Sequence, residues 1–132
     1  MIAGMKHPSL QTLEEYTQEL IGSAAASGIA RFFHLPAVLI VGPKKHLLTT
    51  DRDVELVYSR IKEKYRTEEI VRLAWDDSET SLFQIYPDLV VLKAIMCRSR
   101  SDGSVVRTWA CSYLVREIGG AWKFDLVTAI PN

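Results

Sequence analysis

The sequence predicts an α+β fold in which two amphipathic helices precede a curved, mainly antiparallel β-sheet. The first half contains two segments with apolar residues at helical spacing, and the second half contains alternating apolar segments. Three tight turns join those segments, at Tyr86-Pro87-Asp88, Asp102-Gly103 and Gly119-Gly120, and such residues are typical of consecutive β-hairpins. Helices packed on one face of such a sheet would form a half-open shell that can enclose a pocket.

The first helix is predicted over residues 9–27, where apolar side chains fall on one face. Thr12 and Glu15 resemble a capping box, and Gly28 is expected to end the helix. Small side chains in its last turns favour tight packing against the sheet over space kept for a ligand.

A β-branched and aromatic segment follows at residues 31–41. It contains Pro36, so we expect an edge strand or an irregular approach to one. The second helix is predicted to run to about residue 66, because Thr50 and Asp53 form a capping pair and apolar residues follow at helical spacing.

The three turns set a strand register, and the register divides the side chains of the second half between two faces. One face is mixed in character, and it includes Val127 and Ala129 of the last strand. The helices and any pocket are expected on the apolar, aromatic face, which collects Val90, Leu92, Ala94, Met96, Trp109, Cys111, Tyr113, Val115, Trp122, Phe124, Leu126 and Thr128.

Length and composition exclude several classes of protein. The chain of 132 residues is expected to form a single domain over residues 9–132 after a flexible N-terminus at residues 1–8. Sixteen basic and sixteen acidic residues cancel, which argues against a nucleic-acid partner. No segment approaches the roughly 20 consecutive apolar residues that span a bilayer, so neither a membrane partner nor a membrane segment is expected.

The two cysteines indicate a reducing compartment. The register puts Cys97 opposite Thr108 and turns Cys111 to the other face, so the two thiols cannot meet. Reduced thiols fit an intracellular protein, and a cytoplasmic location is therefore predicted.

The mixed sheet face predicts a homodimer. A sheet covered by helices on one side normally shows a polar face to water on the other, and this sheet does not. A second copy of the chain, related by a twofold axis, is the simplest cover for such a face.

The order of the elements carries a family resemblance. A long first helix, a strand that ends in Gly42-Pro43 and a second helix precede a final hairpin that reads Gly119-Gly120-Ala121-Trp122-Lys123-Phe124. This order resembles the nuclear transport factor 2-like superfamily, which includes ketosteroid isomerase, scytalone dehydratase and SnoaL-like polyketide cyclases, and the match spans residues 10–130. The resemblance implies a cone-shaped fold, a pocket between the helices and the concave face of the sheet, and frequent dimerisation through the other face.

The resemblance does not carry over the best-known chemistry of the superfamily. Ketosteroid-isomerase-like members typically place an Asp directly before a Pro-containing turn as the catalytic base. This chain has Gly42 before Pro43. Proton abstraction needs a titratable group within reach of the carbon acid, so isomerase activity of that kind is not expected.

Three residues are candidates for acid–base catalysis. His34 lies in the strand expected to border the pocket mouth, and histidine titrates near neutral pH. Tyr16 from the first helix and Tyr113 from the aromatic sheet face could point hydroxyl groups into the cavity. For each of them, a hydrogen-bonded core or rim position is the more common explanation.

Four residues are candidates for ligand binding: Trp75, Trp109, Met96 and Phe33. Large rigid aromatic surfaces suit a pocket for an apolar or aromatic small molecule, although core packing explains them as well. Arg98, Arg100 and Arg107 flank the Asp102-Gly103 turn, where a solvated hairpin tip is expected and contact with an anion is the alternative.

No metal or cofactor site is expected. The three histidines are scattered, and neither cysteine has a second ligand at the spacing of a metal site. A Gly-x-Ser-x-Gly elbow is also absent from the sequence.

The favoured interpretation is therefore a cytoplasmic pocket protein that binds an apolar or aromatic small molecule, and no residue of the sequence establishes catalysis. The enzymatic alternative is a cofactor-independent cyclase, isomerase or dehydratase that uses His34 and a tyrosine as an acid–base pair. A further alternative is an interaction module whose sheet face recruits another protein.

Overall fold

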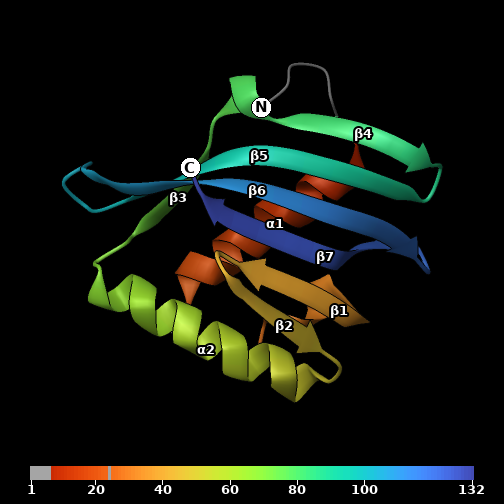
Figure 1. Cartoon of the computed structure of the whole chain (residues 1–132), viewed down its shortest axis with the longest axis horizontal. Helices are drawn as coiled ribbons and strands as arrows, with labels where there is room; N and C mark the ends of the chain where they lie inside the picture. Colours follow the sequence, from red (N-terminus) through yellow and green to blue (C-terminus); the bar gives the residue numbers. More distant parts are fainter. Residues whose placement is uncertain (1–6, 24) are drawn as a thin grey trace.

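The computed structural model describes residues 7–23 and 25–132. Figure 1 shows the arrangement of the elements, and two short 3-10 helices at Ala30–Phe32 and Asp77–Glu79 complete it. In chain order the helices and strands are α1 (Pro8–Gly22), β1 (Phe33–Val41), β2 (Lys44–Leu48), α2 (Asp51–Thr67), β3 (Arg72–Trp75), β4 (Ser81–Tyr86), β5 (Leu89–Ser99), β6 (Val105–Ile118) and β7 (Ala121–Pro131).

The strands form one curved, mixed sheet in the order β2-β1-β7-β6-β5-β3, with β4 also paired to β5. Strands β1 and β7 are parallel, and the other pairs are antiparallel. In Figure 1, α1 crosses behind the sheet and α2 runs along its β2 side. The predicted α+β class, with helices packed on the concave face of a mainly antiparallel sheet, is confirmed.

The start of α1 differs from the prediction. The helix begins at Pro8, and His7 caps it by accepting a hydrogen bond from the backbone N–H of Ser9 at 3.2 Å. The predicted capping residue Thr12 instead donates to the carbonyl of Trp122 at 3.0 Å. Pro8 explains the early start, because proline fits the first helical position, where no backbone N–H is needed.

The end of α1 also differs, since the helix stops at Gly22 and does not extend to residue 27. Gly28 instead lies against the side chain of Glu19 of α1, whose carboxylate would have to shift if residue 28 carried a Cβ atom. Of the segment 1–8 expected to be flexible, residues 1–6 lie outside the described residues, whereas His7 and Pro8 form the start of this helix.

The start of α2 is confirmed. The hydroxyl of Thr50 accepts from the backbone N–H of Asp53, and the carboxylate of Asp53 accepts from the backbone N–H of Thr50. Both groups satisfy N–H donors that a helix end leaves unpaired. Three hydrogen bonds from Thr49 and Thr50 also lower the pKa of Asp53.

Strand β1 is irregular, as expected, but it is not an edge strand. It lies between β2 and β7, because a strand that the sequence did not reveal, Lys44–Leu48, adds to its outer side. Its pairing with β7 shifts register between Phe33 and Val38, and Pro36 lies inside this shift. The missing N–H of proline therefore falls where the ladder is already interrupted.

A bulge in β7 reverses the predicted faces of its second half. Leu114 pairs with Leu126 and Val115 pairs with Phe124, which leaves Asp125 without a partner in β6. One extra residue exchanges the faces of every side chain that follows. Val127 is therefore buried on the concave face, and Leu126 faces outward, opposite to the prediction.

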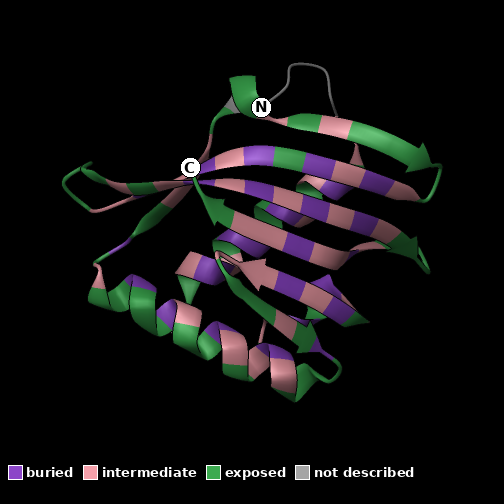
Figure 2. Ribbon diagram, viewed as in Figure 1, coloured by how far each residue is buried: buried purple, intermediate pink, exposed green. Residues whose placement is uncertain are grey.

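The remaining strands follow the predicted alternation, which Figure 2 shows as purple bands on β5 and β6. Cys97 pairs with Thr108 as expected, and both cysteines are free thiols. The core lies between this concave face and the helices, where aromatic rings from α1, α2, β1, β6 and β7 pack edge to face. No helix among the described residues is long and apolar enough to cross a membrane.

Candidate functional site

A small cavity lies between α2 and the concave face of the sheet. Its volume is about 70 Å³. Its wall includes one exposed residue, Lys64. The wall is formed by Tyr16 and Leu20 of α1, Leu39 and Val41 of β1, Tyr58, Ile61, Lys64 and Tyr65 of α2, Met96 and Arg98 of β5, Trp109, Cys111 and Tyr113 of β6, and Val127 and Ala129 of β7.

Tyrosine side chains dominate the polar part of this wall. The hydroxyl oxygens of Tyr16 and Tyr58 lie 2.7 Å apart and share a hydrogen bond. Burial raises the pKa of Tyr16, Tyr58, Tyr65 and Tyr113 above the ordinary value for tyrosine. These hydroxyl groups therefore stay protonated at neutral pH and can donate hydrogen bonds, but they cannot act as bases.

Arg98 is the most unusual residue of the cavity. It continues the inward-facing series of β5 after Met96, and only 6% of its surface is exposed. Its Nε atom is buried without a hydrogen-bond partner, and no carboxylate of the described residues forms an ion pair with it. The guanidinium group lies between two rings, with Cζ 4.7 Å from the centroid of Tyr65 and 4.1 Å from that of Trp109.

Trp109 contributes a second unsatisfied donor. Its side chain is 4% exposed, and the indole Nε1 is buried without a hydrogen-bond partner among the described residues. Beside it, burial raises the pKa of the Cys111 thiol to about 11, so this thiol is neutral at physiological pH. The wall thus combines cationic and neutral donors with apolar surface.

The structure brings four of the predicted site residues to this cavity. Tyr16, Tyr113, Trp109 and Met96 all line it. Phe33 and Trp75 do not line it, although both were expected to bind ligand. They lie in the surrounding core.

Phe33 packs against the rings of Tyr16, Tyr58 and Phe124. Trp75 packs edge to face against Tyr113 and donates from Nε1 to the hydroxyl of Thr17 at 3.3 Å. Both aromatic side chains therefore support the wall of the cavity from behind.

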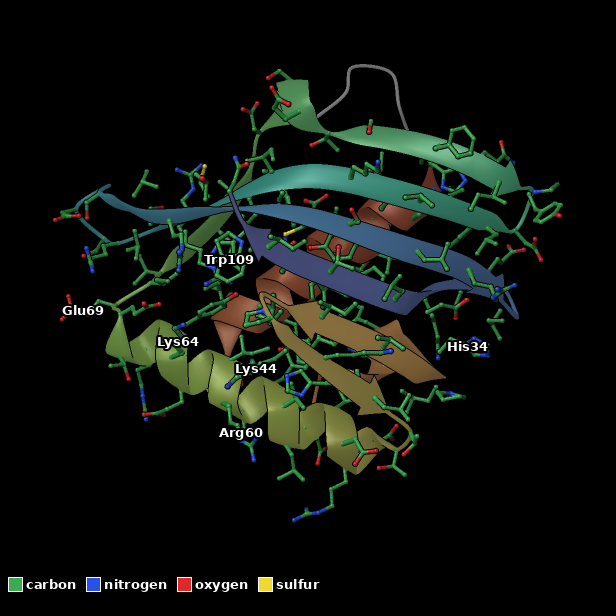
Figure 3. All side chains as sticks on the ribbon, viewed as in Figure 1. His34, Lys44, Arg60, Lys64, Glu69 and Trp109 are labelled. Carbon is green, nitrogen blue, oxygen red and sulfur yellow. The ribbon has the colours of Figure 1, made fainter. Side chains whose placement is uncertain are left out.

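His34 lies on the opposite face of the sheet from the tyrosines. Its side chain is 42% exposed, and Nδ1 lies 2.8 Å from Oδ1 of Asp125. The other carboxylate oxygen of Asp125 accepts a hydrogen bond from Nε of Arg116 at 2.7 Å. Figure 3 labels His34 at the right of the view and Trp109 left of the centre. The expected pair of His34 with Tyr16 or Tyr113 is therefore not formed.

Sequence reasoning missed several cavity residues. Arg98 was placed at a solvated hairpin tip, yet the alternation Val90, Leu92, Ala94, Met96 continues directly to it and points it inward. Tyr58 and Tyr65 lie on the apolar face of α2, at the helical spacing that the sequence shows, and extending this pattern across the pocket would have found them.

A second hollow, of about 250 Å³, lies between α1 and α2. Its central cation is already satisfied, because Nζ of Lys62 donates to the carbonyl oxygens of Glu19 at 2.7 Å and Ser23 at 2.6 Å. These bonds cap the carboxyl end of α1, so Lys62 has a structural role. Within the described part of the chain, no three His, Cys, Asp or Glu side chains gather to hold a metal ion.

Comparisons with solved structures find the same fold. A protein of unknown function with a cystatin-like fold from Nostoc punctiforme superposes with a TM-score of 0.75 at 11% identity, covering 95% of this chain and 89% of that one. An NTF-2 like protein of unknown function from Shewanella oneidensis gives 0.70 at 12% identity, with coverages of 93% and 96%. ActVI-ORFA from Streptomyces coelicolor gives 0.69 at 15% identity, with coverages of 95% and 92%.

At such identities, these similarities show the fold alone. None of the curated protein sequences matches this chain. A family model described as "NTF2-like protein (DUF6841)" matches residues 9–131. This match spans nearly the whole chain, and the protein accordingly belongs to the NTF2-like family DUF6841.

Proposed function

We propose that this protein binds a small organic molecule in the cavity between α2 and the concave face of the sheet. The observation that carries the proposal is the wall itself, in which a few convergent polar groups are set among aromatic and aliphatic side chains. Small-molecule sites have this composition. The two buried donors without partners, on Arg98 and Trp109, further distinguish this wall from ordinary core.

The volume sets the size of the ligand. An apolar cavity of roughly 150 Å³ accommodates benzene. The cavity here is about 70 Å³, so it encloses a molecule of a few non-hydrogen atoms, or one end of a longer molecule. The remainder of a longer ligand would extend past the exposed residue Lys64. A whole aromatic ring would need the wall to open.

The geometry favours binding over acid–base catalysis. An efficient general base has a pKa near the working pH, whereas burial raises the pKa of both Tyr16 and Tyr113 well above the ordinary tyrosine value. His34, the remaining candidate, lies on the other face of the sheet with Asp125. A cyclase, isomerase or dehydratase that relies on His34 and a tyrosine has no support in this arrangement.

The binding proposal is tested by filling the cavity. Ala129 lines the cavity at the end of β7, and Ala129→Leu would occupy its volume. Ala110, in the neighbouring strand β6, faces the opposite side of the sheet, so Ala110→Leu is a matched control. We expect small organic probes to raise the melting temperature of the parent protein and of the control but not of Ala129→Leu.

The experiment can also contradict the proposal. Equal probe-induced shifts in Ala129→Leu and in the parent protein would place binding outside the cavity. Native mass spectrometry of the freshly purified protein provides an independent measurement, because it reports any retained molecule by mass.

We also propose that a second copy of the chain covers the outer face of the sheet. The strand register aligns one apolar row across six strands, and its outermost members are strongly exposed: Phe83 by 68% and Leu47 by 65%. The row consists of Phe83, Val91, Leu114, Leu126, Val38 and Leu47. Exposed apolar surface of this kind is typical of an interface.

Sedimentation equilibrium at micromolar concentration tests this dimer. A mass of two chains is expected for the parent protein, and Leu114→Lys, in the middle of the row, should give a mass of one chain. A monomeric parent protein would contradict the homodimer, and a stable complex with a different protein would instead support the interaction-module alternative. A cytoplasmic location remains part of the proposal, because both cysteines are free thiols.

A further inference from the structure

The charge of Arg98 has no counter-charge among the described residues. Burying a charge costs several kcal/mol unless the charge is paired, and arginine is almost never fully buried without such pairing. Arg98 is nevertheless buried, with only 6% of its surface exposed, and its Nε atom has no hydrogen-bond partner among the described residues. Contacts with two aromatic rings offset part of this cost, but rings supply no hydrogen-bond acceptor with a full negative charge.

The same contacts hold the guanidinium group in place. Tyr65 and Trp109 confine it from two sides, and the neighbouring Arg107 lies 5.5 Å from the Trp109 ring. A donor fixed in this manner loses little entropy when a ligand binds, so the site is organised before the ligand arrives.

A second donor lies against the first. The indole of Trp109 is in contact with the Arg98 guanidinium, and its buried Nε1 also lacks an acceptor. Both side chains line the same cavity. Two adjacent buried donors without acceptors are unusual, because more than about 90% of buried polar groups in proteins have a partner.

The charged residues of the cavity wall also favour an anionic ligand. The charged residues that line the cavity are Lys64 and Arg98, and both are cations. The tyrosine hydroxyls stay protonated, since burial raises the pKa of each, and they add neutral donors. The cavity therefore offers donors and positive charge to its occupant and no anionic acceptor.

We propose that the ligand is a small organic monocarboxylate whose carboxylate group is held by Arg98 and Trp109; this inference rests on the proposed binding function. A carboxylate presents two acceptor oxygens and one negative charge, and it pairs well with the planar fork of arginine. The volume of about 70 Å³ suits a carboxylate group with a short aliphatic chain. That chain contacts the aliphatic part of the wall, which includes Leu39 and Val127.

The primary test compares acids with neutral analogues of the same shape. Propionate and butyrate are titrated into the full-length protein at constant ionic strength, and propionamide and butyramide are titrated in parallel. Binding is followed by the melting temperature and by tryptophan fluorescence. We expect saturable responses to both acids, with dissociation constants about tenfold or more below those of the amides, because hydrogen bonds to a charged group are the stronger ones.

Substitutions then identify the residue that holds the carboxylate group. Arg98→Met keeps the length of the side chain but removes its charge, and it should abolish the advantage of acids over amides. Arg107→Met is the matched control, since Arg107 pairs with Arg98 in the sheet and lies near the same ring but does not line the cavity. Trp109→Phe keeps an aromatic ring and removes Nε1, so it should weaken binding of the acids by a smaller factor.

The outcomes separate this inference from the proposed function. If acids and amides bind with equal affinity and Ala129→Leu blocks the binding of both, the carboxylate inference is wrong, but the cavity is still the binding site. No saturable response to acids or amides in the parent protein would overturn the carboxylate ligand, whereas the proposed binding function would then be decided by the organic probes and by native mass spectrometry. An unchanged preference for acids in folded Arg98→Met would show that Arg98 does not hold the carboxylate group. If that variant fails to fold, the comparison of acids with amides in the parent protein and in Trp109→Phe still tests whether the site prefers a carboxylate.

Discussion

Two arginines on opposite faces of one sheet differ in how the chain compensates their charge. Arg116 faces outward, and its Nε donates to Asp125 at 2.7 Å, while the same carboxylate also contacts His34. Arg98 faces inward and has aromatic rings in place of a carboxylate. The more exposed arginine is thus the one with a counter-charge, and the buried arginine has none among the described residues.

The two faces of the sheet therefore serve different purposes. On the outer face the fold supplies its own counter-charge, so the group of His34, Arg116 and Asp125 is electrostatically complete. In the cavity, none of the described residues supplies a counter-charge to Arg98, although an unpaired buried charge is costly. A site of this kind is more stable when an anion from solution enters it.

The largest effect is expected from truncating the concave face. Phe124 is fully buried against Tyr16, Phe33 and Tyr113, so Phe124→Ala should lower the free energy of unfolding by about 3–5 kcal/mol. Leu126→Ala, two residues along the same strand but on the outer face, should cost clearly less in a monomer. Urea denaturation measures both. A similar cost for the two variants would show that the outer face is also buried, as a homodimer would make it.

Alkaline pH should destabilise the concave face by a smaller amount. Burial raises the pKa of Cys111 from 9.0 to about 11, so the folded state holds this proton more tightly than the unfolded state. The resulting stability is present below pH 9 and is lost as the pH rises to about 11; it amounts to roughly 2–3 kcal/mol at 1.36 kcal/mol per pKa unit. The raised pKa values of the buried tyrosines add to this loss above pH 10.

Urea unfolding measured at intervals from pH 8 to pH 11 tests this expectation. Cys111→Ala should lose less stability than the parent protein between pH 9 and pH 11, because the titrating thiol is absent. An identical pH dependence in both proteins would show that this thiol does not contribute.

The smallest effect compares the two arginines directly. Arg116→Met breaks a partly exposed ion pair and should lower the free energy of unfolding by about 1 kcal/mol. Arg98→Met removes an uncompensated buried charge, so the unfolding free energy without ligand should be unchanged or higher. Thermal denaturation of both variants in buffer without organic acids measures these two changes. An equal loss in both variants would mean that the charge of Arg98 is already compensated.

Local patterns explain how much of the fold could be predicted. The capping pair Thr50 and Asp53 and the alternation of β5 and β6 were read correctly, because each depends on residues close in sequence. The end of α1 at Gly22 was missed, since small residues after it were compatible with helix. Strand β2 was missed because its short, basic sequence becomes a strand only by pairing with β1.

The candidate site was predicted in part for the same reason. Tyr16, Tyr113, Trp109 and Met96 follow from periodicity and register, and all four line the cavity. His34 could not be excluded from sequence, because its face depends on how an irregular strand pairs with β7. Phe33, its neighbour, faces the core but packs behind the cavity wall.

The sequence by itself determined the α+β class, the start of α2, the two-sided character of β5 and β6 and the family resemblance, because each rests on patterns among neighbouring residues. Only the tertiary structure decided the bulge at Asp125, which turns Val127 inward, and the position of Arg98 between Tyr65 and Trp109. Both depend on which distant segments pack together, and the free energy of a charge depends on everything that surrounds it.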